Sequence, residues 1–86
     1  SQVNLYKVSG ITCDPNVNSC YVANDNQILV YGVNSQDGSW MYIKTIDTPA
    51  TATHIALTVG LTTDHKGHLY APASYGKIYI FSINQL

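Results

Sequence analysis

An internal repeat constrains the fold of this chain more than any other feature. The stretch GITCDPNVNSCYVANDNQILVYGVN (10–34) returns fifty residues later as GLTTDHKGHLYAPASYGKIYIFSIN (60–84). Gly10, Asp14, Ile28 and Asn34 recur at Gly60, Asp64, Ile78 and Asn84, and Tyr21 recurs 49 residues later at Tyr70. A chain of 86 residues that contains one unit twice is expected to fold as two copies of one supersecondary structure.

Each copy is predicted to form three short β-strands. Apolar residues alternate with period two, and no segment shows a sustained helical period, so we expect almost no helix. The expected strands are residues 10–13, 20–23 and 28–33 in the first copy, and 60–63, 68–71 and 77–83 in the second. The intervening stretches DPN (14–16) and DHKG (64–67) begin with Asp, which is typical of type I turns.

A fourth strand is expected between the copies, at residues 40–46 (WMYIKTI). Its counterpart lies before the first copy, at residues 3–9, where Tyr6-Lys7-Val8 resembles Ile43-Lys44-Thr45. The strand order along the chain is then D-ABC-D-ABC, a permuted pair of four-stranded units. Four strands per unit with a repeat of about 40–50 residues predict an all-β protein made of two β-propeller blades.

The predicted organisation is a single propeller segment over residues 1–86. It consists of a closing outer strand (3–9), blade one (10–46), an inserted loop (47–59) and the three inner strands of blade two (60–84). Two blades do not close a ring, because propellers typically have about four to eight. We therefore expect either a protomer of an oligomeric ring, such as three copies giving six blades, or a fragment of a larger propeller.

The charge content also favours a chain that buries surface against a partner. Only 10% of the residues are charged, compared with about 25% in an average domain. The chain has no Arg and no Glu, its four Lys are scattered and its formal net charge is −1, which argues against nucleic acid as a partner. No apolar run approaches the ~20 residues of a membrane span.

Cys13 and Cys20 are the only cysteines, and an even count favours one disulfide. They end one expected strand and begin the next, so a hairpin would bring both side chains to one face. Buried free thiols are the alternative, as is half of a metal site, although no second pair of soft ligands is available. A disulfide would place the protein in an oxidising compartment, so we expect it to be secreted or extracellular.

The two copies resemble NHL-like and gluconolactonase-like propeller repeats. The resemblance covers about two-thirds of the chain and rests on GITCD…CYVAN…ILVY and GLTTD…HLYAPA…IYIF. It implies propeller blades. The gluconolactonase-like enzymes hold a divalent metal at the mouth of the central channel with Glu, Asn and Asp, but this chain has no Glu and no position that matches that set. We therefore predict no cofactor; Ca²⁺, with Asp47 or Asp25 as a ligand, would accompany an enzyme.

Candidate ligand-binding residues come mainly from the D–A and B–C loops, which are expected to share one end of the blades. The second D–A loop (47–59) is about 13 residues longer than the first, and function is often grafted where one loop of a repeat differs. The candidates are Asp47, His54, Asn24, Asp25, Tyr75 and Lys77, with Trp40 on the outer strand as a stacking platform. Amide, hydroxyl and aromatic groups of this kind suit a neutral polar ligand such as a sugar.

Each candidate also has a structural interpretation. The long loop would pack over a neighbouring blade through Ile55, Ala56 and Leu57, and His54 would be a hydrogen-bonded structural histidine. Asp14 and Asp64 recur at turn-starting positions, which indicates a structural role for both. The H-x-x-H pair His65 and His68 is a weak metal signal, because two histidines alone do not complete a site.

The preferred hypothesis is a non-catalytic binding or interaction module of a secreted β-propeller, with glycan binding through the loop face as its most concrete form. The alternative is part of a metal-dependent, lactonase-like propeller hydrolase whose catalytic residues lie largely on other blades or chains. The sequence contains no G-x-S-x-G nucleophile motif and no phosphate-binding loop.

Overall fold

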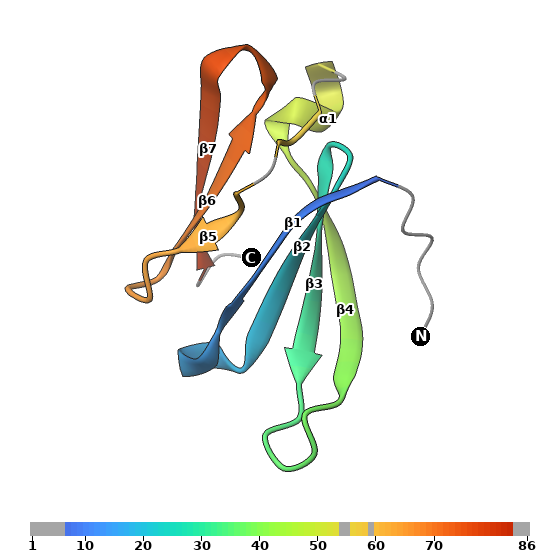
Figure 1. Ribbon diagram of the computed structural model, residues 1–86, viewed down its shortest axis with the longest axis vertical. Helices are drawn as coiled ribbons and strands as arrows, with labels where there is room; N and C mark the ends of the chain where they lie inside the picture. Colours follow the sequence, from blue (N-terminus) through green and yellow to red (C-terminus); the bar gives the residue numbers. More distant parts are fainter. Residues whose placement is uncertain (1–6, 54–55, 59, 84–86) are drawn as a thin grey trace.

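The protein consists of two antiparallel β-sheets with one short helix between them (Figure 1). The computed structural model describes residues 7–53, 56–58 and 60–83. The first sheet contains, in chain order, β1 (Val8–Asp14), β2 (Ser19–Asn24), β3 (Gln27–Val33) and β4 (Trp40–Asp47). After α1 (Pro49–Thr53), the second sheet contains β5 (Thr62–Thr63), β6 (His68–Ala73) and β7 (Lys77–Ser82). The predicted all-β class is therefore confirmed.

The register of the first sheet places the two cysteines directly opposite each other. Cys13 pairs with Cys20 across β1 and β2, and the two form a disulfide. The predicted bridge is confirmed, and it joins the strands at the turn made by the 3-10 helix Pro15–Val17. Asp14 caps this turn, because its side chain accepts a hydrogen bond from the Asn16 N–H.

The N-terminal part of β1 differs from the expected organisation. Val8 and Ser9 belong to β1, and Val8 lies opposite Asn24 with a register shift before Gly10. The first strand of copy one thus begins at Val8, two residues before Gly10. Residues 3–6 of the expected closing strand lie outside the described residues.

The inserted segment contains the helix α1, which the periodicity analysis did not predict. Thr48 precedes Pro49 at the helix start, and the Thr48 Oγ1 atom accepts a hydrogen bond from the Ala50 N–H at 3.1 Å. Threonine as N-cap followed by proline at the first helical position is a favourable helix start. A helix of five residues is too short to show an apolar period, which is why only its cap signals it.

The turn at residues 64–67 is not the expected type I turn. His65 has φ 58 and Gly67 has φ 97, whereas a type I turn needs negative φ at its second position. Asp64 makes this geometry favourable, because its Oδ1 accepts hydrogen bonds from the N–H groups of Lys66 at 2.7 Å and His68 at 3.1 Å. The carboxylate, rather than the turn type, therefore determines the path of the chain here.

The hydrophobic core lies between the two sheets. Each sheet presents one of its faces to it, and residues 50, 57 and 61 of the connecting segment complete it. The buried residues of the core are Tyr21, Ala23, Ile28, Val30, Ala50, Leu57, Leu61, Leu69, Ala71, Ala73 and Ile83, with Ile46, Tyr79 and Phe81 packed against them.

The repeated glycines serve the two copies differently. A Cβ at Gly10 would stand 3.0 Å from the backbone nitrogen of Leu61, so glycine is what lets β1 approach the segment that leads into β5. Gly60 instead has φ 107, a backbone conformation that side chains rarely adopt. Glycine at this position of the repeat thus permits close packing in the first copy and a positive φ in the second.

Candidate functional site

The segment between the sheets is fastened to the β2–β3 turn and to the β6–β7 turn. The Leu57 N–H donates to the Asp25 carbonyl oxygen at 2.7 Å, and the Ser74 N–H donates to the Ala56 carbonyl oxygen at 3.1 Å. The Thr58 N–H donates to the Pro72 carbonyl oxygen at 2.8 Å. Residues 56–58 therefore join the loop ends of both copies (Figure 1).

Polar side chains at this loop end are used to hold the loops together. The Asn26 carbonyl oxygen accepts hydrogen bonds from Thr48 Oγ1 at 2.8 Å and Thr51 Oγ1 at 2.7 Å. Gln27 Nε2 donates to Asp47 Oδ1 at 2.6 Å. These bonds fix the start of α1 on the β2–β3 turn, so the groups that make them have a structural role.

The structure brings only some of the predicted site residues together. Asn24, Asp25 and Asp47 lie at the loop end, where Asn24 Oδ1 accepts a hydrogen bond from the Lys7 N–H at 3.1 Å. Tyr75 and Lys77 lie at the β6–β7 turn; the Tyr75 side chain is 88% exposed, and its φ is 66.

Trp40 does not lie with this group. It begins β4, whereas Asp47 ends the same strand. The predicted site residue His54 lies outside the described residues.

The turns that begin with Asp14 and Asp64 lie at the opposite end of the sheets. Asn16 Nδ2 donates to the His65 carbonyl oxygen at 3.3 Å, and His65 Nδ1 lies 3.8 Å from Asp14 Oδ1, so the two turns touch. Both carboxylates accept hydrogen bonds from backbone N–H groups of their own turns. The structural role that the repeat predicted for these two residues is confirmed.

The Asp64 carboxylate accepts several hydrogen bonds, and these lower its pKa. Desolvation raises the pKa of Asp64, but the N–H groups of Lys66 and His68, the His68 ring and the Tyr70 hydroxyl outweigh it and lower that pKa from 3.8 to about 2. His68 Nδ1 is 2.9 Å and the Tyr70 oxygen 3.0 Å from Asp64 Oδ2. The same bond to Asp64 raises the pKa of Tyr70.

Acid is expected to weaken the fold through Asp64. A carboxylate with a depressed folded-state pKa contributes stability above its unfolded-state pKa, and this contribution is lost as pH falls through the folded-state pKa. With 3.8 as the ordinary value and about 2 in the fold, the loss occurs between roughly pH 4 and pH 2. Asp64→Asn should lower the thermal midpoint at neutral pH and flatten its dependence on pH in this window.

Tyr70→Phe is the graded comparison, because it removes one donor to Asp64 and leaves the backbone donors in place. A carboxyl titration followed by NMR should show the pKa of Asp64 higher in this variant than in the parent chain. If the thermal midpoint of Asp64→Asn depends on pH as that of the parent chain does, Asp64 is not the group whose protonation weakens the fold.

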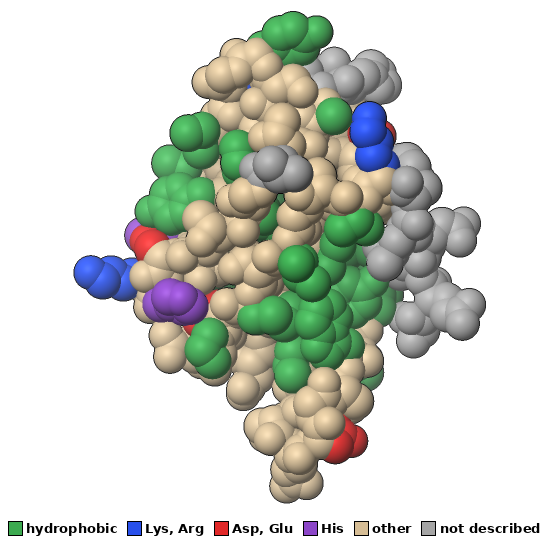
Figure 2. Space-filling model, viewed as in Figure 1, with side chains coloured by type: hydrophobic (Ala, Val, Ile, Leu, Met, Phe, Trp, Pro, Cys, Tyr) green, Lys and Arg blue, Asp and Glu red, His purple; other side chains and the backbone are tan. Residues whose placement is uncertain are grey.

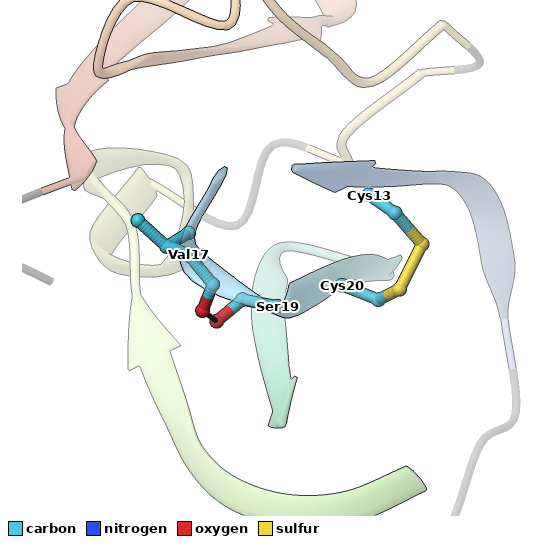
Figure 3. The surroundings of a disulfide bond; sticks show 4 residues. All are labelled: Cys13, Val17, Ser19 and Cys20. Carbon is cyan, nitrogen blue, oxygen red and sulfur yellow. Dashed lines mark hydrogen bonds between the residues drawn. A yellow bond between two sulfur atoms is a disulfide. The ribbon is translucent and has the colours of Figure 1, made fainter. Parts of the chain in front are cut away.

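A cavity of about 250 Å³ lies beside the disulfide, a feature that sequence analysis did not locate. It is lined by Cys13, Asp14, Pro15, Asn18, Ser19, Cys20, Val33 and Trp40. Ser19 Oγ donates to the Val17 carbonyl oxygen at 3.1 Å at its edge (Figure 3). The Trp40 ring lies 5.3 Å from the ring of Tyr31, centre to centre. The cross-strand position of the cysteines was the only available signal for this site.

The outer face of the β5–β7 sheet is apolar and exposed. Because side chains alternate along a strand, the residues between the core-facing ones of β6 and β7 point away from the core. They are Tyr70, Pro72, Ile78 and Ile80. Ile78 is 65% and Ile80 61% exposed, and Figure 2 shows hydrophobic side chains gathered along this side of the molecule.

The outer face of the β1–β4 sheet is also apolar. By the same alternation it carries Ile11, Cys20, Val22, Leu29 and Tyr31. Val22 and Leu29, at its centre, are buried, whereas Ile11 is 57% exposed. A patch of hydrophobic side chains covers this sheet on the face seen in Figure 2. Both sheets thus have apolar surface on the side away from the shared core.

Residues 7–53, 56–58 and 60–83 bring no three His, Cys, Asp or Glu side chains into a group able to hold a metal ion. The described part of the chain contains no helix with the length and apolar character that a membrane crossing needs. Comparisons with known proteins find no match, since no family model, no curated protein and no solved structure is similar enough to indicate a family.

Proposed function

We propose that this chain is a non-catalytic interaction module, made of two β-propeller blades, that works by docking further β-sheets on its two outer faces. The observation that carries the proposal is the exposure of Ile78 and Ile80, which are 65% and 61% exposed on one face. Contiguous exposed apolar surface of this kind marks interaction sites. The Cys13–Cys20 disulfide suits a secreted protein.

The edge of the second sheet supports the blade interpretation. Within the described residues, β7 pairs with β6 on one side and with no strand on the other, whereas its counterpart β3 lies between β2 and β4. An open strand edge is a template for another chain. In the proposed assembly a partner supplies the fourth strand beside β7.

The polar groups favour binding over catalysis. Asp47, Thr48 and Thr51 bond to the β2–β3 turn, so they position the loop. The pKa of Asp64 is lowered to about 2, which makes this carboxylate a weak proton acceptor at neutral pH. At both ends of the sheets, these polar side chains therefore stabilise loops and turns.

Glycan recognition is the second candidate, favoured by the cavity beside Trp40. An aromatic ring next to the polar side chains of Asp14, Asn18 and Ser19 is a suitable surface for a sugar. If Trp40→Ala binds a glycan array as the unchanged chain does, this cavity is not the site.

The docking proposal is tested by native mass together with an apolar fluorescent dye such as anilinonaphthalene sulfonate. We expect either an assembly heavier than the 9.4-kDa chain, with both faces covered and little dye bound, or a monomer whose exposed faces bind the dye. Ile78→Thr with Ile80→Thr should reduce the assembly or the dye signal while the circular dichroism spectrum stays the same. A 9.4-kDa monomer that binds no dye would contradict the proposal.

A further inference from the structure

We infer that the partner on both outer faces is a second copy of this chain, joined head to tail. In this arrangement the outer face of the β5–β7 sheet of one copy covers the outer face of the β1–β4 sheet of the next. The inference rests on the proposed function and adds the identity and orientation of the partner. The chain already forms an interface of this kind within itself, between its two sheets.

The internal interface joins two different faces of the repeated unit. The first sheet contributes Tyr21, Ala23, Ile28 and Val30. The second sheet contributes Leu69, Ala71, Tyr79 and Phe81, together with Leu61 of the segment that leads into β5. Because side chains alternate, these are opposite faces of the repeated unit: the residues that point inward in one copy correspond to residues that point outward in the other. The two copies therefore stack front to back.

The free face of the second sheet repeats the buried face of the first. Shifting the buried residues 21 and 23 by 49, and 28 and 30 by 50, gives the outward-facing residues Tyr70, Pro72, Ile78 and Ile80. Ile28 is 0% exposed and its counterpart Ile78 is 65% exposed. The second sheet thus carries the surface that the first sheet uses for docking, and Ile78 and Ile80 on this surface are exposed.

The free face of the first sheet repeats the buried face of the second. The counterparts of the core-facing residues 61, 69, 71, 79 and 81 are Ile11, Cys20, Val22, Leu29 and Tyr31. Leu61 is 5% exposed and its counterpart Ile11 is 57% exposed. Cys20, Val22 and Leu29 are already buried in the single chain, so a partner would contact mainly Ile11 and Tyr31 on this face.

The two free faces are therefore the two halves of the interface that already exists inside the chain. A second copy placed as the second sheet is placed on the first repeats this face-to-face contact. Such a contact is heterologous, and it closes into a ring when the rotations add up to a full turn. Rings of about four to eight blades correspond to two, three or four copies with two blades each.

Two single-face variants test the pairing of the faces. Ile80→Asp places a charge on the outer face of the second sheet, and Ile11→Asp places one on the outer face of the first; both replaced side chains are exposed in the single chain. Gln36→Asp, in the exposed β3–β4 loop, is the matched control. Circular dichroism verifies that each variant folds, and native mass spectrometry measures assembly.

The unchanged chain and Gln36→Asp should have a mass that is a whole multiple of 9.4 kDa, and each single-face variant should be a 9.4-kDa monomer. An equal mixture of Ile80→Asp and Ile11→Asp should form a dimer that grows no further, because one intact face of each variant pairs and the two charged faces remain.

The pairing is wrong if one variant keeps the parent mass, since a face would then pair with itself, or if the mixture stays monomeric. A parent monomer that binds the apolar dye overturns this inference but leaves the proposed function intact, whereas a monomer that binds no dye overturns both.

Discussion

Truncation of Ile28 to alanine is expected to lower the free energy of unfolding by about 2–5 kcal/mol. Ile28 is 0% exposed and lies in the core between the sheets, with Ala23 opposite it on β2 and Ile46 opposite it on β4. The truncation removes buried methyl groups and leaves a cavity, because strands held by their ladder hydrogen bonds close in only partly. The midpoint of urea unfolding, followed by circular dichroism, measures the loss.

Ile78→Ala is the matched control, because it makes the same change at the same position of the other copy. Its side chain is 65% exposed, so the change should alter the stability of the isolated, dilute chain by no more than about 0.5 kcal/mol. If copies assemble through this face, the cost of Ile78→Ala should rise with protein concentration, whereas that of Ile28→Ala should not. Equal costs in dilute solution would contradict the placement of the two side chains.

Much of the sheet structure was predictable from the repeat. Alternating apolar residues and Asp-led turns located every strand of both copies to within a few residues, because short strands joined by tight turns show both signals locally. The β5 strand is shorter than expected, Thr62–Thr63 rather than 60–63. Gly60, with its positive φ, accounts for the later start.

The inserted segment was less predictable. Its helix depends on a threonine cap and a proline, and its position depends on hydrogen bonds to the Asp25 and Pro72 carbonyl oxygens, which lie in other elements. Main-chain carbonyls carry no sequence signal, since every residue has one. The turn at Asp64 was misassigned for a similar reason: composition alone does not reveal that one carboxylate would accept two of the turn's N–H groups.

The grouping of the candidate site residues was predictable only in part. Asn24, Asp25 and Asp47 lie together, as expected for B–C and D–A loops that share one end of the sheet. Trp40 begins the strand that Asp47 ends, and the seven steps between them, each about 3.3 Å, place the two roughly 23 Å apart. Strand geometry alone therefore separates Trp40 from the loop residues.

The outer faces had a sequence signal of their own. The stretches QILVYGV and KIYIFS are apolar at nearly every position, which is typical of strands that are covered on both faces. A two-sheet protein that used only one face of each sheet would show polar residues at alternate positions. The apolar residues at both sets of positions indicate surface that the single chain does not itself bury.

Loss of the disulfide is expected to lower the free energy of unfolding by about 2–3 kcal/mol. The bond closes a small loop and so reduces the conformational entropy of the unfolded chain. Cys13 and Cys20 are 7 residues apart in sequence. For a domain of this size such a loss corresponds to a fall of roughly 10–20 °C in the thermal midpoint. Thermal unfolding of the parent chain with and without reductant measures it, with Cys13→Ser/Cys20→Ser as the control that should not respond to reductant.

The second copy indicates that the fold itself should survive this loss. At the position equivalent to the disulfide, Thr63 lies opposite Leu69 with no covalent link, and the hairpin still forms. In each copy the turn is already held by a hydrogen bond to its first residue, Asp14 in the first copy and Asp64 in the second. The disulfide therefore adds stability to the first turn without being needed to form it. A parent chain that unfolds at the same temperature with and without reductant would show that this bond does not stabilise the folded state. A reduced chain with no β-sheet signal would show instead that the first sheet, unlike the second, depends on its cross-link to form.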